Sequence, residues 1–242
     1  MLRQLRAALR APVADPDFRL GTVLLGGLAL AGRFIPLVAA VPMVGYLARV
    51  AAATARAEAA PGRTDVDAPD PTRLRSLAVD GVRGGVAVVV FLLPPAALLS
   101  VTVGPAVEQA VAFDGSERLF LPLAAVSTLS VAVAVAYPLP AVLALVGHAG
   151  RLRAGFDRTA LWRAVRSARY LTNVLAGAAS LAVATALGRP LFDVAVGYFI
   201  LAYGLVVAAH LWGDGSGAAV GGVTSRVGGS DEPPATSDRD EG

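Results

Sequence analysis

The sequence contains no cysteine and no lysine, and these absences narrow its chemistry. Without cysteine the chain has no disulfides, thiolate metal sites, iron–sulfur clusters or cysteine nucleophiles. All 21 basic residues are arginine, which we interpret as a compositional bias, because few positions require a bidentate guanidinium group. Charged residues make up only 16% of the chain and the net charge is +3, so the composition does not predict nucleic-acid binding.

Residue types that carry catalysis are also sparse. The two histidines, His148 and His210, lack the spacing of metal-binding motifs, and we expect both to be interfacial side chains near helix ends. The sequence has no G-x-S-x-G elbow and no Walker loop. We therefore predict no catalytic residue, no cofactor and no metal ligand.

Apolar residues, by contrast, are abundant. They form 55% of the chain, and the mean hydropathy is +0.63. A bilayer core of about 30 Å is crossed by roughly 20 helical residues, and five stretches reach or approach that length: residues 20–48, 84–104, 119–147, 171–187 and 191–211. We predict an all-α fold, a polytopic integral membrane helical bundle with about five or six transmembrane segments within residues 20–212.

The first apolar stretch has a permanent charge, Arg33, in its middle. At about 1.5 Å per residue this stretch is too long for one untilted crossing and too short for two full ones. A hairpin of two short helices that bends between Gly32 and Pro36 would place Arg33 at the tip, near headgroups or in a wet cavity. One long tilted helix is the alternative. The hairpin is favoured because it keeps the Arg-rich N-terminus on the same side as the next Arg-rich loop.

Three segments outside the apolar stretches have distinct patterns. Residues 1–19 form an amphipathic arm with leucine on one face and arginine on the other, and Asp15 is the expected cap of the following helix. Residues 157–169 predict an interfacial helix that Asp157 caps and whose apolar face meets acyl chains. Residues 213–242, rich in Gly, Ser, Pro and acid, predict a disordered cytoplasmic tail.

The distribution of arginine predicts the orientation. Residues 49–83 and residues 149–170 hold six arginines each, whereas residues 105–118 and 188–190 hold one each. Cytoplasmic loops of membrane proteins are enriched in basic residues. We therefore expect a multi-pass protein of the cell membrane, with the two Arg-rich loops and the C-terminal tail in the cytoplasm.

Small residues predict how the helices associate. Gly81 and Gly85 form a G-x-x-x-G step, and residues 176–188 carry a small residue at every fourth position: Ala176, Ser180, Ala184 and Gly188. Such stripes let helix backbones approach closely in lipid. They predict a packed bundle, within one chain or between copies.

Short motifs between and after these stretches form a recognisable pattern. A G-Y-x-x-R-V step and an L-x-x-D-G step flank a polar loop, formed by Gly45, Tyr46, Arg49 and Val50 and by Leu77, Asp80 and Gly81. Farther on stand "YPLPAVLALVGHAGRLRAGFD" and "RYLTNVLAG". On these motifs residues 15–213 resemble an uncharacterised membrane-protein family, domain of unknown function 4013, which is frequent in halophilic archaea. The resemblance implies a polytopic membrane fold and no assigned activity.

Three residues of these motifs have a physical interpretation. Tyr46 and Arg49 are expected at the cytoplasmic interface, where the polar tip of the ring and the guanidinium group reach headgroups. Asp80 lies at a comparable depth at the start of the next span. We hypothesise that Arg49 and Asp80 pair and clamp the hairpin to the bundle, with plain interfacial anchoring as the alternative.

The predicted role is a non-enzymatic membrane assembly or lipid-interacting component, whose partners are the lipid bilayer and either a second copy or a membrane complex. The alternative is a transporter or permease-like subunit for an anionic substrate, in which Pro-broken helices and Arg33 line the path. Arg33, Arg189 and Asp193 either form one buried cluster or snorkel separately to the headgroups. An intramembrane enzyme ranks third because no nucleophile and base can be named. The candidate structural or functional residues are Arg33, Tyr46, Arg49, Asp80, Gly81 and Asp193.

Overall fold

The structure, a computed structural model, describes residues 2–60, 66, 68–110 and 120–228. Within these ranges every regular element is a helix: α1 Leu2–Ala14, α2 Pro16–Ala31, α3 Pro36–Ala59, α4 Leu74–Ala110, α5 Phe120–Ala136, α6 Leu139–Ala149, η2 Leu152–Phe156, α7 Arg158–Val165, α8 Ala168–Gly188, η3 Arg189–Leu191 and α9 Val196–Gly228. Five helical segments are long and apolar enough to cross a membrane: Pro36–Ala59, Leu74–Ala97, Leu129–Ala149, Ala168–Leu191 and Val196–Gly221. The predicted fold class is confirmed.

The first apolar stretch forms two helices. Asp15 caps α2, because its carboxylate accepts hydrogen bonds from the backbone N–H groups of Asp17 and Phe18. Helix α2 ends at Ala31, and α3 begins at Pro36. The alternative of one continuous helix is therefore wrong. The prediction of two short helices needs correction as well, because α3 has 24 residues and is a full-length span candidate, while α2 has 16 residues.

Helix α1 covers part of the bundle. Its residue Ala8 is fully buried against Val207 and Leu211 of α9, and the hydroxyl of Tyr203 donates a hydrogen bond to the carbonyl oxygen of Leu9. The arm predicted from the leucine and arginine pattern is thus helical, and its apolar face packs on α9 of its own chain.

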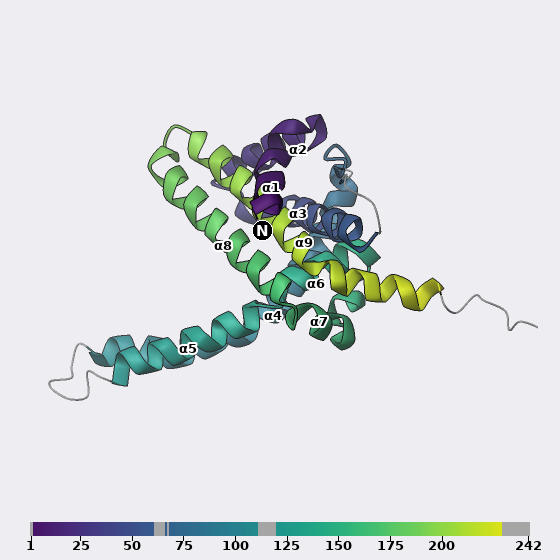
Figure 1. The fold of residues 1–242 in the computed structure, drawn as a ribbon. Coiled ribbons are helices and arrows are strands. Elements are labelled where there is room, and N and C mark those ends of the chain that lie inside the picture. Colours follow the sequence, from purple (N-terminus) through teal and green to yellow (C-terminus); the bar gives the residue numbers. More distant parts are fainter. Residues whose placement is uncertain (1, 61–65, 67, 111–119, 229–242) are drawn as a thin grey trace, which may run out of the picture.

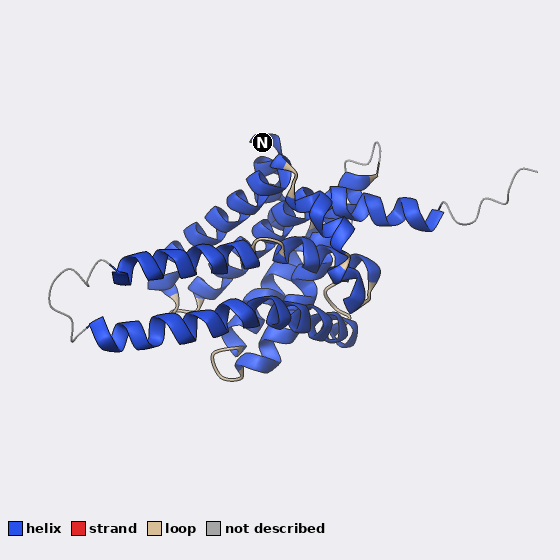
Figure 2. Cartoon of the chain, turned by 90° about the horizontal axis from the view of Figure 1, so that it is seen from below, coloured by secondary structure: helices blue, strands red, loops and turns tan. Residues whose placement is uncertain are grey.

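Helices α4 and α5 pack against each other and extend away from the remaining helices (Figure 1). The start of α4 contacts α3, whereas the side chains of Val89, Leu93, Val101 and Val133 along the extended pair are exposed. Viewed from below, this pair again projects beyond the remaining helices (Figure 2). Its apolar side chains therefore face outward, as expected for surfaces in contact with lipid.

At the break between α5 and α6, a tyrosine from a neighbouring helix forms hydrogen bonds with free backbone groups. The hydroxyl of Tyr170 in α8 donates to the carbonyl oxygen of Tyr137 at 2.7 Å and accepts from the N–H of Ala141 at 3.3 Å. These backbone groups flank Pro138, which starts the break. A proline in a membrane helix frees backbone groups that need new partners, and Tyr170 supplies one.

The predicted interfacial helix 157–169 is shorter than expected. Asp157 caps α7 by accepting from the N–H groups of Thr159 and Ala160, but α7 ends at Val165 and α8 begins at Ala168. Its apolar face packs against the protein's own core, where Ala160 and Ala164 are buried beside Tyr170. The prediction that this face meets acyl chains is wrong, because the ends of α6 and α9 already cover it.

The last helix is much longer than predicted. Helix α9 continues to Gly228, so the prediction of disorder is wrong for residues 213–228, and residues 229–242 lie outside the described residues. Three glycines spaced four apart, Gly213, Gly217 and Gly221, lie against the alanine-rich end of α3. A Cβ at Gly213 would stand 2.3 Å from the carbonyl oxygen of Ala51. In the sequence these glycines indicate disorder, whereas in the structure they let α9 pack closely against α3.

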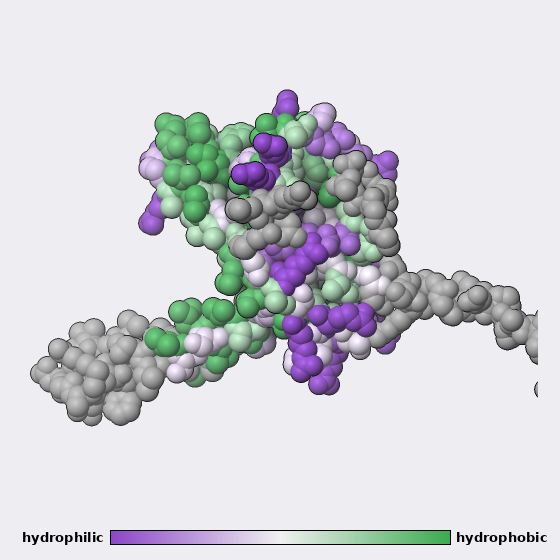
Figure 3. Space-filling model, viewed as in Figure 1, coloured by the Kyte–Doolittle hydropathy of each residue, from purple (hydrophilic) through white to green (hydrophobic). Residues whose placement is uncertain are grey.

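The two Arg-rich segments meet at one end of the bundle. Arg83 in α4 approaches Gly150 after α6, and Arg169 at the start of α8 contacts Glu58 at the end of α3. Hydrophobic residues gather over the α8–α9 turn and over α5, and hydrophilic residues gather over α7 (Figure 3). The charged helix ends that carry the candidate site therefore share one side of the molecule.

Candidate functional site: a basic pocket where α3 meets α4

Two glycines bring α3 and α4 into direct backbone contact. A Cβ at Gly45 would stand 2.0 Å from the carbonyl oxygen of Leu77, and a Cβ at Gly81 would stand 1.8 Å from that of Val41. Either distance is impossible for a real side chain. Both positions therefore require glycine, and Gly81 is a packing residue at the point where the two helices cross.

This crossing places Arg49 opposite Asp80. Arg49 lies one helical turn after Gly45, and Asp80 directly precedes Gly81. The Nε and Nη2 atoms of Arg49 lie 2.8 and 2.6 Å from Oδ2 of Asp80. The structure thus brings together the two residues for which pairing was hypothesised, and their side chains are only 20% and 23% exposed.

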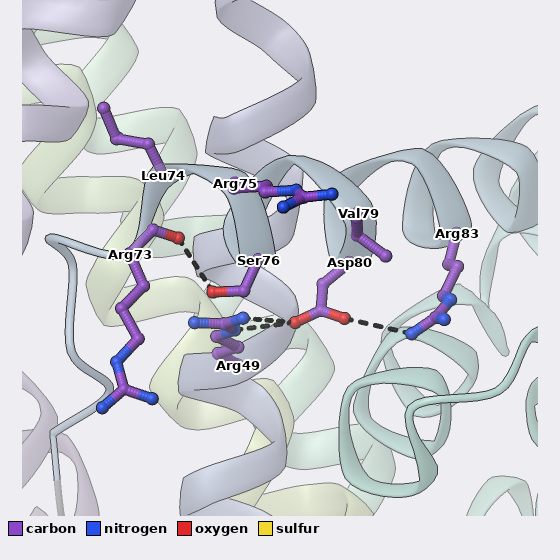
Figure 4. Close-up of a pocket in the computed structure, with 8 residues that line it drawn as sticks. All are labelled: Arg49, Arg73, Leu74, Arg75, Ser76, Val79, Asp80 and Arg83. Carbon is purple, nitrogen blue, oxygen red and sulfur yellow. Dashed lines mark hydrogen bonds and ion pairs between the residues drawn. The ribbon is translucent and has the colours of Figure 1, made fainter.

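A second arginine completes the arrangement. Nη1 of Arg83 lies 3.4 Å from Oδ1 of Asp80, so one carboxylate sits between two guanidinium groups. Figure 4 shows Arg49 and Arg83 pointing toward Asp80 from either side, while the guanidinium group of Arg73 extends away from it. Charge-assisted hydrogen bonds of this kind fix the positions of the guanidinium groups.

These residues line an open pocket of about 600 Å³ at the start of α4: Arg49, Arg73, Leu74, Arg75, Ser76, Val79, Asp80 and Arg83. The lining contains four guanidinium groups and one carboxylate, so the pocket carries an excess of positive charge. Asp70 pairs with Arg73 at 3.2 Å on the outer rim. Hydrogen bonds from the hydroxyl and the N–H of Thr72 lower the pKa of Asp70, which keeps this carboxylate ionised.

The chain matches the family model described as "Protein of unknown function (DUF4013)" over residues 28–192. It belongs to this family. The DUF4013 match confirms the family predicted from the short motifs, over a narrower range than the predicted 15–213. It includes every residue of the basic pocket and leaves α1 and α9 outside. Comparisons with curated proteins and with solved structures gave no match.

A polar cluster missed in the sequence joins the DUF4013 region to α9. Arg169 contacts Glu58 of α3 and, at 2.9 Å, Oδ1 of Asp214 in α9, and Nδ2 of Asn173 donates to Oδ2 of Asp214 at 2.7 Å. Asp214 and Asn173 are buried. The missed signal was the spacing of Arg169 and Asn173, which places both on one face of α8.

One turn along the same helices, another polar contact lies inside the bundle. Oγ1 of Thr54 lies 3.3 Å from Nδ1 of His210, and the Thr54 hydroxyl also donates to the carbonyl oxygen of Val50. His210 was expected near a helix end, but α9 extends well past it. This histidine is therefore a partner between helices rather than an interfacial side chain.

The remaining candidates lie elsewhere. Tyr46 is buried, with 2% of its surface exposed, and its ring packs where a Cβ of Gly21 would be, so its predicted position among headgroups is wrong. Within the described residues its hydroxyl has no hydrogen-bond partner. Arg33 is exposed in the turn after α2, and Asp193 is exposed beside η3.

The buried charged cluster predicted for the apolar stretches is absent among the described residues. Arg33, Arg189 and Asp193 are all exposed, and no ion pair joins them. The two turns that hold them leave these side chains at the surface, where the charges need no buried partner. In the same described part of the chain, no group of three His, Asp or Glu side chains could hold a metal ion.

Proposed function

We propose that this DUF4013 protein is a non-enzymatic, multi-pass component of the cell membrane that binds anionic lipid headgroups in its basic pocket. The pocket belongs to the Arg-rich end of the bundle, which the positive-inside rule assigns to the cytoplasm. Anionic headgroups of the cytoplasmic leaflet attract arginine clusters at helix ends. The family match and the five apolar helices support the membrane setting.

One observation carries this proposal: the pocket lining holds more guanidinium groups than its carboxylate can neutralise. Asp80 engages Arg49 and Arg83. Arg75 has no ion-pair partner within the described residues, and the side chain of Arg73, which pairs with Asp70 outside the lining, is 77% exposed on the rim. A phosphodiester accepts bidentate hydrogen bonds from guanidinium groups, and Leu74 and Val79 offer apolar contact beside them.

Thermal unfolding of the purified protein in neutral detergent tests the proposal. A ligand that binds only the folded state raises the melting temperature, and we expect phosphatidylglycerol to raise it by about 5 °C relative to phosphatidylcholine. The double variant Arg73→Gln/Arg75→Gln should lose most of that difference. The matched control is Arg33→Gln/Arg189→Gln, which removes two exposed arginines from the segments that precede α3 and α9. This control should keep the full difference in melting temperature between the two lipids.

Two results would overturn the assignment. The pocket does not bind the lipid if Arg73→Gln/Arg75→Gln keeps the full wild-type difference. The ligand is a free anion if inorganic phosphate at equal concentration reproduces the shift. Arg33 does not line the basic pocket, so this pocket does not support the path for an anionic substrate on which the transport alternative rests.

A further inference from the structure

A second cavity lies on different helices from the basic pocket. It is a groove of about 460 Å³ between α1, α8 and α9, and we call it the α8–α9 groove. Its lining is almost wholly apolar and includes Leu5, Leu9, Val183, Leu187, Ile200 and Val207. Its two polar lining groups already have partners, since the Ser180 hydroxyl donates to the carbonyl of Ala176 and the Tyr203 hydroxyl to that of Leu9. The groove therefore fits a hydrocarbon rather than a polar ligand.

The small-residue stripe of α8 forms the floor of this groove. A Cβ at Gly204 would stand 2.3 Å from Cβ of Ala184, so α8 and α9 touch along this line. Larger side chains rise on either side, and those of Val183 and Leu187 are 58% and 60% exposed. From Ala176 to Leu187 the groove follows α8 for roughly 16 Å, about half of a bilayer core of about 30 Å. That length is comparable to the length of one acyl chain.

Positive charge stands at the α1 end of the groove. Leu5 and Leu9 line it, while Arg6 and Arg10 are exposed on the adjoining face of the same helix. Leu5, Ala176 and Tyr203 all pack against the buried cluster of Ala8, Val207 and Leu211, so α1 lies at the end of the groove that is farther from the α8–α9 turn. Figure 3 shows hydrophilic residues of α1 beside the hydrophobic surface of α8 and α9. This charge complements an anionic headgroup.

We propose that the α8–α9 groove holds one acyl chain of an anionic membrane lipid, whose headgroup is bound by Arg6 and Arg10. Helix α1 then acts as a clamp across the lipid, held in place by the hydrogen bond from Tyr203. This site is independent of the basic pocket, because the two share no residue and no helix. It lies on α1, α8 and α9, of which α1 and α9 fall outside the family match.

Native mass spectrometry of the protein released from nanodiscs tests this site. The nanodiscs contain equal amounts of phosphatidylglycerol and phosphatidylcholine, and we expect the wild type to retain phosphatidylglycerol. Ala179→Trp fills the groove and should abolish retention. Its control is Ala182→Trp, which places the same side chain on an exposed position of α8 outside the groove.

A second variant leaves the packing of the helices untouched. Arg6→Gln/Arg10→Gln should reduce retention roughly thirtyfold, because each arginine near an anionic surface contributes about one kcal/mol. Arg158→Gln/Arg163→Gln removes two exposed arginines from α7 and should retain the lipid as the wild type does. Arg73→Gln/Arg75→Gln should also retain it, which separates this site from the basic pocket.

Three outcomes would overturn the proposal. Wild-type retention in both Ala179→Trp and the Arg6/Arg10 variant would show that the groove is not the lipid site. Equal retention of phosphatidylcholine would show that Arg6 and Arg10 do not bind an anionic headgroup. A wild-type dimer that Ala179→Trp converts to a monomer would identify a second copy of the chain as the occupant.

Discussion

At the scale of single residues, the contact between α3 and α4 depends on the absence of two side chains. Gly45 and Gly81 let the backbones touch, and this contact sets Arg49 opposite Asp80. The glycines therefore position the charged residues of the basic pocket. At this contact, close packing of the two helices contributes more to stability than the ion pairs do, because partly exposed ion pairs alone contribute little.

Replacing Gly81 by alanine tests how much the close packing of α3 and α4 contributes to stability. Gly81→Ala should destabilise the protein by about 1–3 kcal/mol, because its Cβ would overlap the carbonyl of Val41. Gly85→Ala is the control one turn later, where a Cβ would meet nothing within 4 Å. It should be neutral or stabilising by up to about 1 kcal/mol through helix propensity. Thermal melts in one detergent compare the two, and equal effects would contradict the close crossing.

The Arg49–Asp80 pair can be measured by a double-mutant cycle. Arg49→Gln, Asp80→Asn and the double variant should give a coupling energy of about 1 kcal/mol in thermal or denaturant unfolding. Asp80→Asn alone should cost more than Arg49→Gln alone, because it also removes the partner of Arg83. A coupling energy near zero would support plain interfacial anchoring of both side chains.

At the scale of elements, α9 shows how composition can mislead. Residues 213–221 read "GDGSGAAVG", a composition typical of flexible tails. Their glycines nevertheless recur every four residues, as do Ala51, Ala55 and Ala59 on α3. Two stripes of small residues meet, and Ala219 and Val220 become buried. The helix forms because it has a partner surface, which composition alone does not reveal.

Engineered disulfide formation tests this part of α9, and the absence of native cysteine makes the test simple. A Cβ at Gly221 would lie 3.6 Å from Cβ of Ala59, within the range of disulfides. Ala59→Cys/Gly221→Cys should therefore cross-link almost completely under mild oxidation, as seen by a gel shift after cleavage between the helices. Ala59→Cys/Gly27→Cys should not, because a Cβ at Gly27 meets nothing within 4 Å. Equal cross-linking of both pairs would indicate a flexible segment.

At the scale of the whole molecule, the charged residues separate along the long helices. Arg49, Arg83, Arg169 and Asp214 gather where the Arg-rich segments meet. Arg33 and Asp193 lie in the turns that precede α3 and α9, at the opposite ends of these helices. In each of these two helices the turn and the charged cluster therefore lie toward opposite ends of the apolar segment.

Cysteine accessibility in intact cells tests this arrangement. Single variants Arg33→Cys and Asp193→Cys should react with a membrane-impermeant maleimide added outside. Arg75→Cys and Arg158→Cys should react only after the membrane is opened, because the positive-inside rule assigns their segments to the cytoplasm. Labelling of Arg33→Cys and Arg75→Cys from the same side would contradict a membrane crossing by α3. Labelling of Arg33→Cys and Asp193→Cys from opposite sides would contradict the shared orientation of α3 and α9.

The sequence by itself determined the class of this protein and several of its local features. Apolar runs of membrane length, the caps at Asp15 and Asp157, and the break between Gly32 and Pro36 depend on neighbours in the chain. The hypothesis that Arg49 pairs with Asp80 also came from the sequence, because both residues flank the same loop.

Only the tertiary structure decided which apolar faces meet protein and which meet lipid. A leucine or alanine face has the same pattern in both cases, since lipid tails are as apolar as a core. Tyr46, the apolar face of α7 and the glycines of α9 were therefore assigned wrongly, and each is covered by a helix distant in sequence. The cluster of Glu58, Arg169 and Asp214 was missed for the same reason, because three separate helices must pack before their charges meet.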